Sequence, residues 1–178
     1  AIGGAAIGVA SSSKKDRGKG ALIGAASGAA VGGGIGYYMD VQESKLRQQL
    51  KSTGVSVTRN GDNIILNMPN DVTFDVDQTV LSQRAKSVLD SVVLVAKEYD
   101  KTRLNVIGHT DSSGSDSYNL RLSQVRASEV AQYITSQKVS GGRVSSTGMG
   151  ESQPIASNAD AAGRAQNRRV EIMLTPIG

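Results

Sequence analysis

The residues best suited to chemistry lie in one stretch, where an acid, a base and the chain's single histidine surround a polar loop. An extended run over residues 104–107 ends in Gly108-His109-Thr110-Asp111. Arg126 follows fifteen residues after Asp111, in a predicted helix. Loops held between a strand and a helix commonly carry binding groups. A carboxylate and a guanidinium brought together here suit a ligand that carries both an ammonium and a carboxylate.

The elements on either side of this loop are expected to position the two charges. The loop is built of small polar residues, and Gly114 is free to adopt positive φ. Ser117 or Asn119 can cap the helix that follows. Apolar residues then recur at helical spacing, at Ala127, Val130, Ala131 and Ile134. Arg126 is therefore expected near the start of this helix.

The same residues allow an enzymatic interpretation, which is weaker. On a strand, His109 and Asp111 share a face because residues two apart point the same way. Catalysis by a serine needs the nucleophile, the base and an orienting group held together. Ser112 and Ser113 instead lie in a flexible loop, and the sequence identifies no oxyanion donors. The chain is therefore predicted not to be an enzyme.

Composition excludes several other kinds of site. The 178 residues include no cysteine and one histidine, which leaves neither a thiolate site nor a multi-histidine site for a metal. No metal or other cofactor is predicted. The net charge of +4 is modest and only 3% of residues are aromatic, whereas nucleic-acid binding usually shows a basic stripe with stacking aromatics. Nucleic acid is therefore not an expected partner.

Residues 1–40 differ from the rest because they hold eleven of the 21 glycines. Five of these recur at every fourth residue, at Gly20, Gly24, Gly28, Gly32 and Gly36. That spacing lays them along one helical face, where two helices can approach closely, as in membrane contacts. Residues 20–39 carry no charge, and this is about the length of a membrane-spanning helix.

Two interpretations of this segment remain open. Glycine costs about 1 kcal/mol per residue relative to alanine in a water-exposed helix, which favours a flexible tether. Helical packing in a membrane fits the composition equally well, with residues 11–17 joining two apolar halves into a hairpin. The glycine face also allows homo-oligomers. The chain starts at Ala1, inside the glycine pattern, which indicates a fragment or a processed product.

The remaining sequence divides into a linker and a domain. Residues 41–52 are polar and contain neither Gly nor Pro, which predicts a solvated linker helix. Residues 53–178 are predicted to form one domain. Asn60-Gly61 between two apolar stretches is a strong signal for a β-hairpin, and residues 82–99 have the apolar periodicity of an amphipathic helix.

Further strands are predicted around residues 104–107, 144–148 and 169–174. In the last of these Val170, Ile172 and Leu174 alternate with polar residues, which is typical of a half-buried strand. The order is βαβαβ with a leading hairpin. This order favours an α+β fold, a two-layer sandwich in which two main helices cover one face of a mixed sheet.

Five groups of residues fall in the order and spacing of a known domain. They are Gly108-His109-Thr110-Asp111, Asn119 with Leu122-Ser123, Arg126-Ala127, Gly148-Met149-Gly150-Glu151 and Asn167-Arg168-Arg169-Val170-Glu171. Together they resemble the OmpA-like C-terminal domain, a peptidoglycan-binding module shared by OmpA, the Pal lipoproteins and the MotB stators. The resemblance covers residues 53–176, and its combined motifs are specific.

The resemblance implies a ligand and the residues that contact it. In this family, the aspartate and arginine that match Asp111 and Arg126 grip meso-diaminopimelate in the peptide stem of peptidoglycan. The free end of that amino acid carries an ammonium and a carboxylate on one carbon. Further contacts are expected from Asn119, Thr110, Asp75, Leu122 and Arg168. His109 is expected to serve packing and loop shape.

The predicted function is non-catalytic binding of peptidoglycan, which links the outer membrane to the cell wall. The N-terminal region would associate with the outer membrane, and the domain would face the periplasm. Two alternatives are a cell-wall hydrolase and an envelope scaffold that binds protein partners.

Overall fold

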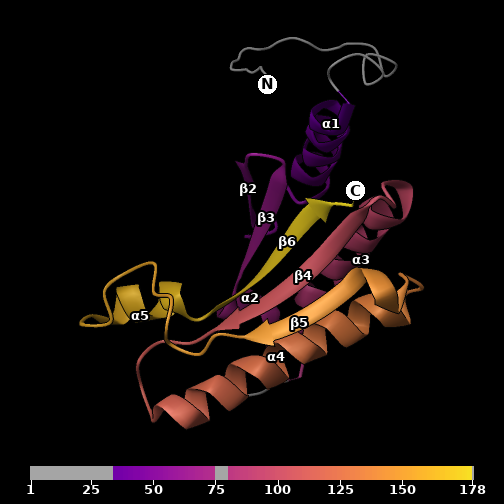
Figure 1. Ribbon diagram of the computed structural model, residues 1–178. Coiled ribbons are helices and arrows are strands. Elements are labelled where there is room, and N and C mark those ends of the chain that lie inside the picture. Colours follow the sequence, from indigo (N-terminus) through magenta and orange to yellow (C-terminus); the bar gives the residue numbers. More distant parts are fainter. Residues whose placement is uncertain (1–33, 75–79, 178) are drawn as a thin grey trace. The chain divides into compact units, whose positions relative to one another are not determined.

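The computed structural model of the chain describes residues 34–74 and 80–177 (Figure 1). The chain divides into two compact units, residues 1–44 and 45–178. Helix α1 (Gly34–Gln49) crosses this division. Most of the glycine pattern, with its membrane and tether interpretations, lies outside the described residues. Among the helices that the structure does describe, none is long and apolar enough to cross a membrane.

Helix α1 differs from the predicted linker helix at both ends. The described helix begins at Gly34 rather than at residue 41, and no proline interrupts the sequence between these two positions. It ends at Gln49 rather than at residue 52. It is also not a purely solvated spacer. Leu46 and Leu50, four residues apart, have 0% and 2% of their surface exposed. Residues at this spacing lie on one side of a helical turn.

The second unit is built on one five-stranded mixed sheet. Its strands are β2 (Ser56–Asn60), β3 (Asn63–Pro69), β4 (Thr102–His109), β5 (Val144–Gly148) and β6 (Arg169–Pro176). The order across the sheet is β2-β3-β6-β4-β5. Only β4 and β5 pair in parallel; the other neighbours are antiparallel. The predicted hairpin is confirmed, with Gly61 at φ +62° in its turn.

Two main helices accompany the sheet, as predicted. They are α3 (Gln83–Glu98) and α4 (Asp116–Ser136), which contact each other, and α4 also lies along β4 and β5. Shorter helical segments are α2 (Asn70–Thr73), η2 (Gly141–Arg143) and α5 (Ala161–Asn167). None of these three short segments was predicted from the sequence. Each has only a few residues, too few for a periodic apolar pattern to emerge.

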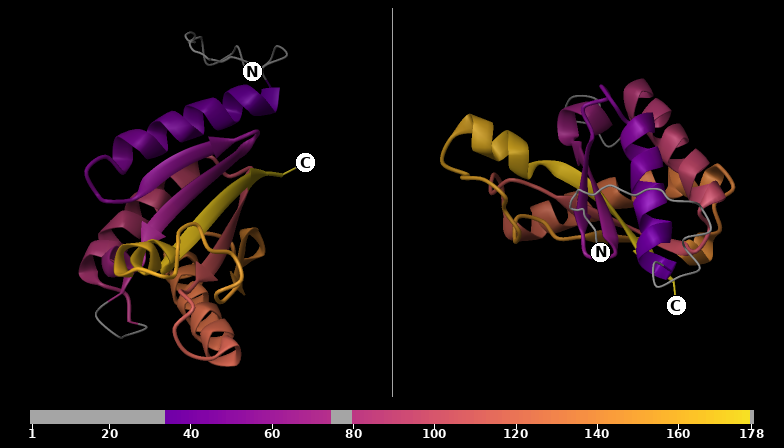
Figure 2. Two further views of the ribbon diagram at one scale, coloured as in Figure 1. Left: turned by 90° about the vertical axis from the view of Figure 1, so that its left-hand side faces the viewer. Right: turned by 90° about the horizontal axis from the view of Figure 1, so that it is seen from above.

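Alternating side chains of the strands form the core. In β6, Val170, Ile172 and Leu174 have at most 1% of their surface exposed, and their neighbours in β3 and β4 are buried in the same register. The helices bury one stripe each, through Val88, Leu89 and Val92 of α3 and through Ala127, Val130 and Ile134 of α4. The α+β sandwich is confirmed. Helix α5 does not cover the sheet and instead projects beyond its end (Figure 2).

Candidate functional site

Asp111 lies two residues after the end of β4, at the end of the sheet where the predicted loop begins. Its side chain is nearly enclosed, and the residue is 6% exposed. One oxygen, Oδ1, accepts a hydrogen bond of 2.8 Å from the backbone N–H of Ser113. The other, Oδ2, accepts one of 2.7 Å from Nη1 of Arg168. Burial alone would raise the pKa of Asp111, but these two donors outweigh it and hold the pKa below its ordinary value.

Arg168 reaches Asp111 because of the sheet register. Strand β6 runs antiparallel to β4, and His109 pairs with Arg169 at the last position of the ladder. The residue before β6 therefore lies beside the residues that leave β4. The guanidinium remains partly open to solvent, with 35% of the side chain exposed. Arg168, expected among the contact residues, lies in direct contact with the carboxylate of Asp111.

Arg126 lies elsewhere than expected. The cap of α4 is Ser115, whose hydroxyl accepts from the N–H of Tyr118, so the helix starts earlier than either predicted cap would allow. Arg126 is ten residues from the first residue of α4, almost three turns along at 3.6 residues per turn. It is 8% exposed, and its guanidinium carbon lies 5.3 Å from the centre of the Phe74 ring, a cation–π contact.

Within the described part of the chain, Asp111 pairs with Arg168. The helix begins two residues earlier than a Ser117 cap would place it, and Arg126 lies on the buried side of its third turn and not near its start.

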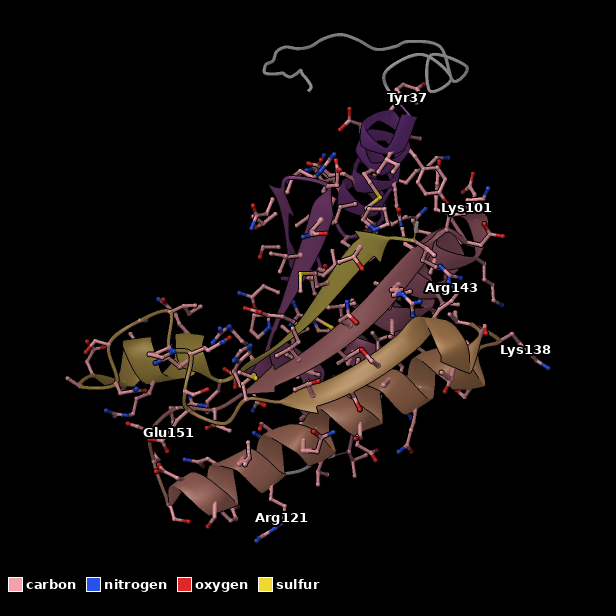
Figure 3. The ribbon with its side chains drawn as sticks, viewed as in Figure 1. Tyr37, Lys101, Arg121, Lys138, Arg143 and Glu151 are labelled. Atoms are coloured by element: carbon pink, nitrogen blue, oxygen red, sulfur yellow. The ribbon has the colours of Figure 1, made fainter. Side chains whose placement is uncertain are left out.

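Asn119 is not the helix cap. It lies in the first turn of α4 with 2% of its surface exposed. Its Nδ2 donates to the carbonyl oxygen of Asp111 at 3.3 Å and to Oε1 of Glu151 at 2.8 Å. Asn119 thus ties the loop after β4 to the loop after β5. Figure 3 shows Glu151 at the same end of the sheet as the start of α4.

The remaining predicted site residues are placed as follows. Thr110 is 5% exposed. Its hydroxyl donates to the carbonyl oxygen of Asp111 at 2.8 Å, and its backbone N–H donates to the carbonyl oxygen of Gly150 at 2.8 Å. Leu122 is half-buried on α4. Asp75 falls in residues 75–79, outside the described residues. Its neighbour Phe74 is 3% exposed, as expected for a core anchor.

Two glycines allow α4 to approach the strand ends closely. A Cβ atom on Gly108 would lie 2.3 Å from the carbonyl oxygen of Ser123, and one on Gly148 would lie 2.4 Å from the N–H nitrogen of Gln124. Ser123 also accepts a 2.9 Å hydrogen bond from the N–H of Gly150 through its hydroxyl. These contacts hold the helix that carries Asn119 and Arg126 against the end of the sheet.

His109 lies in a cluster with Glu171 and Arg169. It is 3% exposed, and its Nε2 lies 3.4 Å from Oε1 of Glu171. The other oxygen of Glu171 accepts from Nε of Arg169 at 2.8 Å. The contact with His109 and the bond from Arg169 lower the pKa of Glu171 to about 2, although burial opposes them. This supports the expected packing role of His109.

Sequence reasoning missed the polar contacts that join the loops. Glu151 is in the motif Gly148-Met149-Gly150-Glu151, so the motif pointed to the residue but not to its partner Asn119. Arg169 was not predicted as buried, yet it is 3% exposed and donates to the carbonyl oxygens of Asn167 and Gln153. Partners so far apart in sequence are brought together only by the sheet register.

The chain matches two protein families. Residues 73–168 match the OmpA family, and residues 1–43 match the glycine zipper family. It is 61% identical over 174 residues to the probable lipoprotein YiaD of Escherichia coli (strain K12), and the match covers 98% of this chain and 80% of YiaD.

Two further proteins are similar over part of the chain. The peptidoglycan-binding protein ArfA of Mycobacterium tuberculosis (strain ATCC 25618 / H37Rv) is 38% identical over 103 residues, which are 58% of this chain and 32% of ArfA. The solved structure of the cell wall anchor of the T6SS from Pseudomonas aeruginosa aligns with a TM-score of 0.68 at 29% identity. That alignment covers 76% of this chain and 96% of the anchor.

Proposed function

Because the chain belongs to the OmpA family, we propose that it binds peptidoglycan without cleaving it and recognises diaminopimelate in the peptide stem. Two similar proteins support this proposal, since one is named as peptidoglycan-binding and the other as a cell wall anchor. The observation that carries it is the ionised carboxylate of Asp111, which has the guanidinium of Arg168 2.7 Å away.

The proposed contacts follow from the charges of the ligand. Asp111 accepts hydrogen bonds from the ligand ammonium. Its lowered pKa keeps the carboxylate ionised for this role. The ligand carboxylate takes donors from Arg126, as the family motif implies. Arg168 is a second donor to the same carboxylate, because ammonium and carboxylate share one carbon and Arg168 adjoins Asp111. Thr110, Asn119, Leu122 and Asp75 complete the proposed binding residues.

The proposed setting is the cell envelope. Residues 53–178 form the binding domain and residues 41–52 its link to the glycine-rich segment, residues 1–40. This segment associates with the outer membrane and its glycine face allows oligomers, while the domain faces the periplasm. The match of residues 1–43 to the glycine zipper family and the likeness to a probable lipoprotein support this placement.

Stem peptides that differ at one residue test the ligand. The full chain is titrated with a soluble tripeptide stem ending in meso-diaminopimelate and with the same peptide ending in lysine. Lysine has the side-chain ammonium but lacks the second carboxylate. We expect the diaminopimelate peptide to bind at least tenfold more tightly, since one charge-assisted hydrogen bond contributes about 1.5–3 kcal/mol. Equal affinities would contradict recognition of the zwitterion.

The two other functions make different predictions with the same protein. A hydrolase releases soluble fragments from purified sacculi, whereas a binding module sediments with intact sacculi and releases none. A scaffold for protein partners is not displaced from its target by free diaminopimelate, whereas a peptidoglycan-binding module is.

A further inference from the structure

The connection between β5 and β6 is organised around one buried amide. We call residues 152–168, which include α5, the α5 connection; Figure 1 shows it extending past the end of the sheet. Asn167, next to the C-terminal residue of this segment, has 0% of its surface exposed. Its Oδ1 accepts from the N–H groups of Ile155 and Ala156, and its Nδ2 donates to the Ala156 carbonyl and to Oδ1 of Asn158, all within 3.0 Å.

A close contact also keeps the α5 connection compact. A Cβ atom on Gly163 would lie 1.9 Å from the carbonyl oxygen of Ser157, so only glycine fits there. Asp160 caps α5 by accepting from the N–H of Gly163 at 2.6 Å. Arg164 donates from Nη1 to the carbonyl oxygen of Asn158 at 3.0 Å. The backbone around Asn158 is thus held from both sides.

Asn158 joins this compact segment to the loop that carries Asp111. Its Oδ1, which already accepts from Asn167, also accepts from the backbone N–H of Ser112 at 3.3 Å. Ser112 is the residue directly after Asp111. The α5 connection therefore touches the loop twice, through Asn158 at Ser112 and through Arg168 at Asp111.

We propose that Asn158 is a positioning residue for ligand binding, which holds the Asp111 loop in its binding geometry. This inference rests on the proposed function of the site. When a ligand ammonium and carboxylate enter, Asp111 and Arg168 redirect hydrogen bonds to them. The bond between Asn158 and Ser112 involves no ligand group, so it persists in the free and bound states. It removes loop freedom before the ligand arrives, and such preorganisation reduces the entropy lost on binding.

Two substitutions at Asn158, one that removes its acceptor oxygen and one that keeps an acceptor there, test the role of this side chain. Asn158→Ala removes the acceptor, and we expect the affinity for the diaminopimelate stem tripeptide to fall about threefold to tenfold, the equivalent of one hydrogen bond. Asn158→Asp keeps an acceptor for both donors, so its affinity should not fall. Asn105→Ala is the matched control: its Oδ1 accepts from the Ser145 hydroxyl at 2.7 Å on β4, away from the loop.

Titrations use the full chain at a temperature well below every melting temperature, alongside a thermal melt and amide hydrogen exchange of Ser112. The expected result is weaker binding and faster Ser112 exchange in Asn158→Ala alone. Equal affinity of Asn158→Ala and Asn105→Ala would overturn the inference, as would equal losses in the Ala and Asp variants. Rapid Ser112 exchange in the unmodified chain would also overturn it, whatever the variants do. If Asp111→Asn still binds the tripeptide, the proposed function itself fails.

Discussion

At the residue scale, the proposed function makes Asp111 the group on which binding should depend most. Replacing it with Asn removes the anion that accepts the ligand ammonium, and losing one partner of an enclosed charge pair costs about 2–5 kcal/mol. Asp111→Asn should therefore abolish retention on sacculi in a sedimentation assay. The melting temperature should change little, since Arg168 is partly exposed and such ion pairs contribute about 0–1 kcal/mol. A variant that melts normally and still sediments would contradict the assignment.

Arg126 combines a proposed binding role with a packing role that its burial and its contact with Phe74 support. Because it is 8% exposed and lies over Phe74, Arg126→Ala should lower both the affinity and the melting temperature. Arg126→Lys keeps the charge and a cation over the ring, but it loses the fork that contacts a carboxylate in two places. We expect Lys to restore most of the melting temperature and little of the affinity for the stem tripeptide. Full binding by the Lys variant would show that charge alone suffices.

Glu171 gives the domain a pH dependence of stability that is separate from binding. Its folded pKa of about 2 lies below the ordinary value of 4.5. A carboxyl with a lowered folded pKa contributes stability above its unfolded pKa and loses that contribution as the pH falls through the folded one. Glu171→Gln should therefore destabilise the chain at pH 7, on the order of 1–3 kcal/mol by denaturant unfolding. The difference in free energy of unfolding between Glu171→Gln and the unmodified chain should shrink as the pH falls from 4.5 to 2. A difference that stays constant over this range would contradict this account.

At the element scale, the approach of α4 to the strand ends depends on glycine. Gly108→Ala places a methyl group against the Ser123 carbonyl, and overpacking of this kind costs about 1–3 kcal/mol. Gly141→Ala is the control, because a Cβ atom there meets nothing within 4 Å. Urea unfolding should show a clearly lower free energy of unfolding for Gly108→Ala and almost no change for Gly141→Ala. Similar midpoints for the two variants would mean that α4 adapts without cost.

Elements with a periodic signal were predictable, and their junctions were not. The hairpin at Asn60-Gly61, the strand of Val170, Ile172 and Leu174, and the long amphipathic helix were all identified from spacing. The start of α4 was misplaced because several serines in the loop are equally good caps, and only packing selects Ser115.

The candidate site was predicted in part for the same reason. Motif spacing led to Asp111, Asn119 and Arg168, which the structure brings together. It did not predict which cation pairs with Asp111, because that depends on the register between β4 and β6. The contacts of Asn158 depend on the path of the α5 connection, for which the sequence has no periodic signal.

At the scale of the whole molecule, the glycine-rich segment is expected to respond to lipid. Its glycines disfavour a helix in water but favour close helix packing where hydration does not compete. A peptide of residues 1–39 should therefore gain helical circular dichroism signal when lipid vesicles or detergent micelles are added. An unchanged spectrum would leave only the tether interpretation.

Strand β6 is the last in the chain, yet it occupies the centre of the sheet, between β3 and β4. Asp111 and its partner Arg168 are 57 residues apart, and Arg168 lies beside Asp111 because the start of β6 pairs with the end of β4. A chain that ends before residue 168 lacks both the partner of Asp111 and the complete α5 connection. The proposed binding site is therefore complete only when the central strand of the sheet has formed, which couples the site to the folding of the domain.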